Sequence, residues 1–155
     1  MVFKFEKLEV WQLSIDLANE VYSLIDSLPD SEKFNLTSQI RRAVTSVSLN
    51  IAEGSTGQTD PEQIRFIGYA HRSLMEVVAC LILMKKRDYI STDLYEKLYQ
   101  NSEKLSAKLL AMKRYISKKD FNRMSLMKVM NSIKQWSFVV CQWSFVVIHR
   151  HKLQE

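Results

Sequence analysis

Residues 39–57 read Q-I-R-R-A-V-T-S-V-S-L-N-I-A-E-G-S-T-G and carry the clearest helical pattern in the chain. Apolar residues recur there every three or four positions, which predicts one face packed against a core; they are Ile40, Val44, Val47 and Ile51. A polar stripe follows another side of the same helix: Arg42, Ser46, Asn50 and Glu53. A plain surface helix carries mainly Lys and Glu on its back, so this stripe is typical of a helix packed on two sides.

Start and stop signals on either side of this stretch bracket four helical segments. The first is expected at about Lys7–Leu28, because Pro29 disfavours helix in the residue before it. The second is expected at Phe34–Glu53, with Gly54 as the left-handed residue that ends it. The third opens at T-D-P-E, residues 59–62, and closes on the cations of residues 85–87. Ser91 or Thr92 caps the fourth, whose apolar seam is Leu94, Leu98, Leu105, Leu109, Met112 and Ile116.

The composition favours long helices, because 155 residues contain only 3 Gly and 2 Pro. Sandwiches and barrels need many more turns. Four helices joined by short loops predict an all-α fold, an antiparallel up-down-up-down four-helix bundle over residues 1–118. Residues 119–155 form a C-terminal extension.

The charged N-terminus resembles no signal peptide, and no run approaches the ~20 apolar residues of a membrane span, so we expect a cytoplasmic protein with no membrane partner. Cys80 and Cys141 are expected to be free thiols.

The first helix carries an apolar face wider than one antiparallel neighbour covers. One series is Leu8, Trp11, Ile15, Ala18, Tyr22 and Ile25, and the adjacent series is Val10, Leu13, Leu17, Val21, Leu24 and Leu28. The surplus face predicts contacts between subunits.

The extension contains a seven-residue duplication, Q-W-S-F-V-V-C at 135–141 and Q-W-S-F-V-V-I at 142–148. A repeat of heptad length is compatible with a helix that places Trp136 and Trp143 on one face. The aromatic and β-branched residues also favour a strand. An extension without a selected role is the simplest interpretation, and weak metal binding by Cys141, His149 and His151 is a minor alternative.

The net charge of +5 lies entirely in residues 118–155. Residues 1–117 hold 15 Lys or Arg and 15 Asp or Glu, so the bundle is neutral overall. Acidic residues concentrate on the first helix, whereas basic residues concentrate on the third and fourth, where Lys104, Lys108, Lys113 and Arg114 run along the last. The candidates for nucleic-acid contact are Arg41, Arg65, Arg72, Lys85, Lys86, Arg87, Lys104, Lys108 and Arg114. A solvated helix surface is an equally good interpretation of these residues alone.

Three motifs together resemble the bacterial 23S rRNA intervening-sequence protein family, whose members are often called simply four helix bundle proteins. They are F-E-K-L-E-V-W-Q at 5–12, Q-I-R-R-A-V-T-S-V-S-L-N-I-A-E-G at 39–54, and G-Y-A-H-R-S-L-M-E at 68–76. The signature falls on Arg42, Ala43, Ser46, Asn50, Ile51, Ala52, Glu53 and Gly54, and on Ala70, Ser73 and Glu76. The family is similar to the accessory variability determinant of diversity-generating retroelements, a pentameric bundle that binds nucleic acid and a reverse transcriptase.

The resemblance implies a homo-oligomer, expected to be a pentamer, with no catalytic residue, metal or cofactor. A set of polar residues is expected at subunit contacts or in structural roles: Arg42, Ser46, Asn50, Glu53, Gly54, Ser73 and Glu76. The leading prediction is a non-enzymatic bundle that associates with nucleic acid or a ribonucleoprotein. One alternative is an adaptor for a protein such as a reverse transcriptase, and a distant third is a small hydrolase or nuclease acting through Glu53 and Glu76.

Overall fold

The structure is a computed structural model that describes residues 2–32, 34–57 and 59–151; the side chains of residues 30, 129 and 131–151 lie outside the description. Its helices are α1 (Glu9–Ile25), α2 (Leu36–Thr56), α3 (Asp60–Lys86) and α4 (Thr92–His151). Two short 3-10 turns, η1 (Lys4–Lys7) and η2 (Asp30–Glu32), precede α1 and α2. No strand occurs among the residues that have an assigned conformation.

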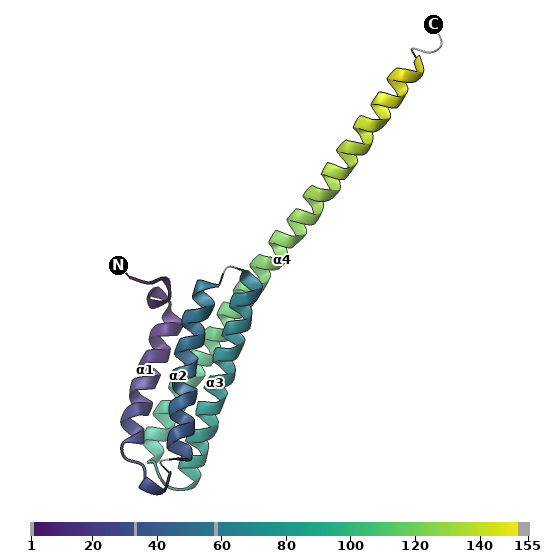
Figure 1. Cartoon of the computed structure of the whole chain (residues 1–155). Coiled ribbons are helices and arrows are strands. Elements are labelled where there is room, and N and C mark those ends of the chain that lie inside the picture. Colours follow the sequence, from purple (N-terminus) through teal and green to yellow (C-terminus); the bar gives the residue numbers. More distant parts are fainter. Residues whose placement is uncertain (1, 33, 58, 152–155) are drawn as a thin grey trace. The chain divides into compact units, whose positions relative to one another are not determined.

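The chain forms two compact units, Met1–Ser117 and Lys118–Glu155. In the first unit α1, α2, α3 and the beginning of α4 run side by side, joined by short connections (Figure 1). The predicted all-α four-helix bundle is therefore confirmed. The first helix is shorter at both ends than the sequence predicted, and α4 is much longer than the expected 20 or so residues.

The core lies along the bundle axis and is built from the predicted apolar faces. Ile40, Val44, Val47 and Ile51 of α2 are all buried, as are Leu98, Leu105, Leu109 and Ile116 of α4. Leu94 and Met112 pack against this core while remaining partly exposed. Helical periodicity thus identified which side of each helix the fold would bury.

The α2–α3 contact depends on Gly54, and here the structure corrects the prediction that this glycine ends the second helix. Gly54 is buried within α2, which continues to Thr56, and no glycine in the described chain has a positive φ. A Cβ placed on Gly54 would lie 2.8 Å from Cβ of Phe66 in α3. The glycine is therefore needed for close approach of two helices, and not for a left-handed turn.

Both ends of α3 follow specific capping chemistry. At its start the Thr59 hydroxyl accepts a hydrogen bond from the Glu62 backbone N–H at 3.3 Å, and Pro61 occupies the first turn, as predicted. At its end Asp88 has a φ of 55°. The N–H groups of Asp88 and Tyr89 donate to the carbonyls of Lys85 and Met84, at 3.1 and 3.0 Å. This pair of bonds is a Schellman motif with Asp88 in the left-handed position.

On α1 the two predicted apolar series have different environments. Val10, Leu17, Val21 and Leu24 of one series are buried in the core. In the other series Ala18 and Ile25 are buried, whereas Ile15 is partly exposed and Tyr22 is 40% exposed. Leu13 and Leu28 of the first of these series are half-buried, like Ile15. The surplus apolar surface predicted for this helix is therefore small, and Tyr22 is its one exposed side chain in the two series.

The structure corrects one expectation about apolar segments and decides between two alternatives for another. By length and composition alone α3 could cross a membrane, since an 18-residue window has a mean hydropathy of 1.4, with 33% of it buried in the bundle. The core-facing side chains of that helix, such as Leu74, Val77 and Leu81, fill the bundle interior.

In the second unit α4 continues as helix through the duplicated heptads, so the strand preference of their residues does not prevail.

Candidate nucleic-acid interface

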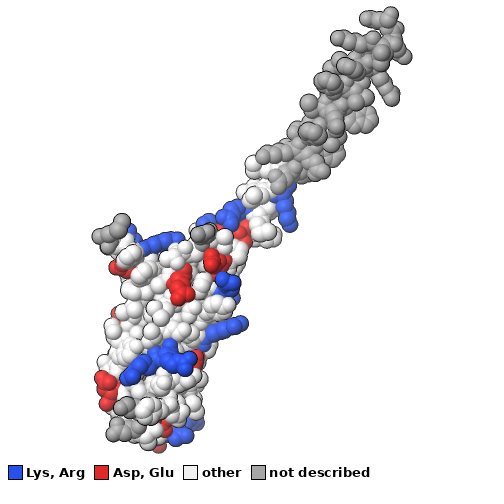
Figure 2. All heavy atoms as spheres, viewed as in Figure 1, with Lys and Arg blue, Asp and Glu red and all other residues white. Residues whose placement is uncertain are grey.

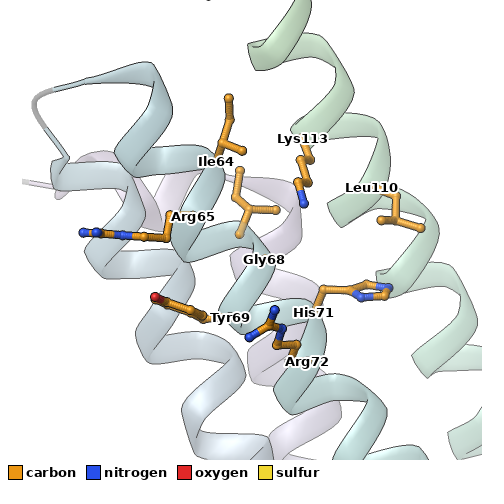
Figure 3. Close-up of a pocket in the computed structure, with 9 residues that line it drawn as sticks. Ile64, Arg65, Gly68, Tyr69, His71, Arg72, Leu110 and Lys113 are labelled. Carbon is orange, nitrogen blue, oxygen red and sulfur yellow. The ribbon is translucent and has the colours of Figure 1, made fainter.

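A groove of about 420 Å³ lies between α3 and α4, and its charged lining residues are all basic. It is lined by Ile64, Arg65, Ile67, Gly68, Tyr69, His71, Arg72, Leu110 and Lys113. Lys113 reaches from α4 towards the stretch of α3 at Gly68, and Arg72 lies one turn further along α3 (Figure 3). Arg65 extends away from α4 in the same view, so it borders the groove without pointing into it. We call this feature the basic groove.

The absence of a side chain at Gly68 brings the Lys113 ammonium close to the α3 backbone. A Cβ placed on Gly68 would lie 3.8 Å from Lys113 Nζ, which is ordinary van der Waals contact. Lys113 itself is half-buried between the helices. Because a partly desolvated cation is screened less by water than an exposed one, it attracts an anion more strongly.

Carboxylate partners distinguish three of the basic candidates, one of them Arg65 at the border of the groove. Lys108 pairs with Glu9 at 2.9 Å and Arg87 with Glu32 at 3.5 Å. Arg65 approaches Glu62 at 3.9 Å and lies over the Phe66 ring. In the described part of the chain no ion pair involves Arg72 or Lys113. Hence the fold leaves the charge of these two cations available to a ligand.

The other predicted cations are dispersed. Lys104 lines a second groove together with Asp16 and Glu20 of α1, where acidic groups compensate its charge. Lys85 donates to the Thr92 hydroxyl at 2.7 Å. Arg41, Lys86 and Arg114 are exposed on separate helices or at a helix end. The structure therefore gathers Arg65 and Arg72 of the nine candidates at one groove and adds Lys113, which was not among them.

His71 lies at the edge of the basic groove and contacts α4. Its Nε2 is 2.9 Å from the Ser106 hydroxyl oxygen, a hydrogen bond that joins α3 to α4. The pair holds the two walls of the groove together. This histidine therefore has a packing role between α3 and α4.

The polar stripe of α2 lies along the border with α3 on the bundle surface. Arg42 and Glu53 are exposed, whereas Ser46, Asn50, Ser73 and Glu76 are half-buried. Asn50 Nδ2 donates to the Ser46 carbonyl at 2.7 Å, and Gln39 donates to the Glu76 carboxylate. Arg72 and Glu76 are four residues apart on α3 but form no ion pair among the described residues, and Glu76 bonds across to α2 instead. Nor does an ion pair join Arg42 to Glu53 or Glu76 within that part of the chain.

The stripe shows no convergent arrangement for acid–base catalysis among the described side chains. Glu76 is engaged by Gln39 of the neighbouring helix, and Glu53 is exposed on α2. The described side chains show no contact between these two carboxylates. The hydrolase alternative therefore receives no support from this geometry.

The fold and the groove define a four-helix bundle with a small, carboxylate-free basic groove between its last two helices. Residues 6–112 match the model of the 23S rRNA-intervening sequence protein family, and the chain belongs to that family. A solved structure of a protein of unknown function from the S23 ribosomal protein family of Bacteroides thetaiotaomicron VPI-5482 is similar, with a TM-score of 0.64 and 25% identity. The similarity covers 68% of this chain and 95% of that one. No curated protein matches the chain.

Proposed function

We propose that this protein is a non-enzymatic homo-oligomer, expected to be a pentamer, that binds nucleic acid through the basic groove. The observation that carries the binding proposal is that Arg72 and Lys113 share a groove whose lining contains no carboxylate. Lys and Arg contacts to phosphates supply most of the affinity in sequence-independent binding. In an oligomer the groove is repeated, so weak individual contacts combine into stronger binding.

Binding can be tested with the full-length chain and two matched variants. Lys113→Gln and Lys108→Gln each remove one positive charge from α4, but Lys108 is already paired with Glu9. Titrations of labelled RNA and duplex DNA at two salt concentrations should show weaker binding for Lys113→Gln and a salt slope reduced by about 1. Lys108→Gln should bind much like the unmodified chain.

Two outcomes would contradict the binding proposal. Equal effects of the two substitutions would mean that the groove has no special role. Absence of binding by the unmodified chain at low salt would favour the adaptor alternative, in which the bundle contacts a protein such as a reverse transcriptase.

The assembly proposal is supported by apolar side chains on the outer surfaces of the first three helices. Tyr22, Leu49 and Leu83 are 40%, 55% and 50% exposed. On the face that covers α1, α2 and α3, charged side chains form isolated clusters on a largely uncharged surface (Figure 2). Large exposed apolar patches mark sites of protein contact, and we propose that the subunits meet on this face.

The assembly is tested by sedimentation of the full-length chain and of Leu49→Glu. A single exposed apolar residue contributes little to the fold of one subunit, so this variant should keep its helicity while its oligomers dissociate. A monomer at micromolar concentration for the unmodified chain would overturn the assembly proposal.

A further inference from the structure

A further groove, different from the one that Lys104 lines, adjoins the basic groove on the same side of α3 and α4. It has a volume of about 350 Å³ and is lined by Met75, Val78, Tyr99, Ser102, Glu103, Ser106, Ala107 and Leu110. Leu110 lines both grooves, and the hydrogen bond between His71 and Ser106 joins a wall of one to a wall of the other. We call this further groove the apolar groove.

The two grooves differ in chemistry. The basic groove presents Arg72 and Lys113 without a carboxylate. The apolar groove presents aliphatic side chains, one aromatic ring and a single acid, Glu103. The aromatic ring is that of Tyr99, which is half-buried and packs against the Tyr95 ring with centroids 5.6 Å apart. An anion is thus attracted to one groove, and a planar, weakly polar group suits the other.

An unpaired nucleotide has the same division into an anionic phosphate and a planar base. We propose that the two grooves together hold a short run of unpaired nucleotides in a single-stranded nucleic acid. One phosphate of the run lies against Arg72 and Lys113, and the base of a nucleotide further along the run lies in the apolar groove beside Tyr99. This inference rests on the proposed nucleic-acid binding and specifies the class of ligand.

The spacing of the lining residues requires more than one nucleotide. Lys113 and Tyr99 are 14 residues apart on α4, which is about 21 Å along a helix. One sugar separates a phosphate from its base by a much shorter length. A strand that runs along the two grooves therefore places a phosphate at Lys113 and the base of a later nucleotide beside Tyr99.

A double helix does not fit this pair of grooves, because its bases are paired and stacked in the interior. Unpaired bases can be splayed out and stacked on aromatic side chains, which is how proteins recognise single strands. Glu103 repels a phosphate but accepts a hydrogen bond from an exocyclic amino group, as carboxylates do with cytosine N4. The apolar groove therefore favours cytosine or adenine over uracil.

The test compares three ligands of equal length with the full-length chain at low salt: a single RNA strand, its duplex, and an abasic strand that keeps the phosphates. The intact single strand should bind about tenfold more tightly than the abasic strand, because base stacking is lost in the latter. Tyr99→Leu should remove this advantage and leave binding of the abasic strand unchanged. Its helicity and unfolding temperature should be compared with those of the unmodified chain.

Glu103→Gln provides a second variant that does not threaten folding, because the side chain is exposed. It should reduce the preference of the chain for oligocytidine over oligouridine. Equal binding of intact and abasic strands, with Lys113→Gln still harmful, would overturn the nucleotide inference and leave the proposed function standing. Absence of binding by all three ligands would overturn both.

Discussion

Tyr89 donates its hydroxyl to the buried Glu32 carboxylate at 3.1 Å, and this bond ties the α3–α4 connection to the α1–α2 connection. The same carboxylate accepts a hydrogen bond from Asn35 Nδ2 at 3.0 Å and pairs with Arg87 at 3.5 Å. It also lies 3.5 Å from the backbone N–H of Leu36, the first residue of α2. One acid therefore fixes two connections and the start of a helix.

Substitutions at this contact should differ in their effect on stability. Tyr89→Phe removes one donor from a carboxylate that keeps its others, so the free energy of unfolding should fall by about 1 kcal/mol. Glu32→Ala leaves several donors and a cation without their acceptor, and should cost about 2–3 kcal/mol. Urea unfolding at equal protein concentration measures both. Equal losses would show that Glu32 contributes only through Tyr89.

Alanine at the two helical glycines should change stability in opposite directions. At Gly54 the new methyl would clash with Phe66, at 2.8 Å, so the helices must separate and stability should fall by about 1–3 kcal/mol. At Gly68 the methyl meets only Lys113 Nζ, at 3.8 Å, so the gain in helix propensity should prevail, at about 0.5–1 kcal/mol. Thermal unfolding distinguishes the signs. A stabilised Gly54→Ala variant would show that the α2–α3 approach tolerates a methyl group.

Asp88→Gly should stabilise the bundle. A non-glycine residue in the left-handed region costs on the order of 1 kcal/mol, and an acid is unfavourable at the C-terminal end of α3. Asp88→Asn removes only the charge, so it should recover a smaller part of the gain. Chemical unfolding of the two variants separates the backbone contribution from the electrostatic one, and a neutral effect of glycine would argue against strain at this position.

Stability should decrease in alkaline solution through Cys80. Burial raises the pKa of the Cys80 thiol, and the Glu76 carboxylate raises it further. In the unfolded chain the thiol ionises near its ordinary pKa, so above about pH 8.5 the unfolded state loses its proton first and stability falls as pH rises. Cys80→Ala in a Cys141→Ser background should show a weaker decline of stability with pH over this range. An unchanged decline would assign it to other groups.

The bundle was predictable because its helices bury stripes that repeat at helical spacing, as Ile40, Val44 and Val47 illustrate. The role of Gly54 was not, because a glycine near the end of a helical pattern is compatible with either a left-handed cap or a close helix contact. Only the position of Phe66 on the neighbouring helix decides between them.

The basic groove was predictable only in part. The sequence placed basic residues on the third and fourth helices, but it could not show which of them meet acids from other helices. Lys108 and Lys113 are five residues apart, yet one reaches Glu9 of α1 and the other lies over Gly68 of α3. Pairing across helices depends on rotation and register, which a single sequence does not specify. The position of Gly68 between Arg65 and Arg72 was the available signal.

The fixed start of α3 limits which changes of sequence the proposed site can tolerate. Its start at Thr59 and the close contact of Phe66 with Gly54 set the rotational phase of the helix before Arg72 is reached. Each residue turns an α-helix by about 100°, so one inserted residue between Phe66 and Arg72 would carry the guanidinium to a different side of α3. Substitutions in this stretch would alter the strength of the proposed binding, whereas insertions or deletions would move the Arg72 guanidinium off the groove altogether.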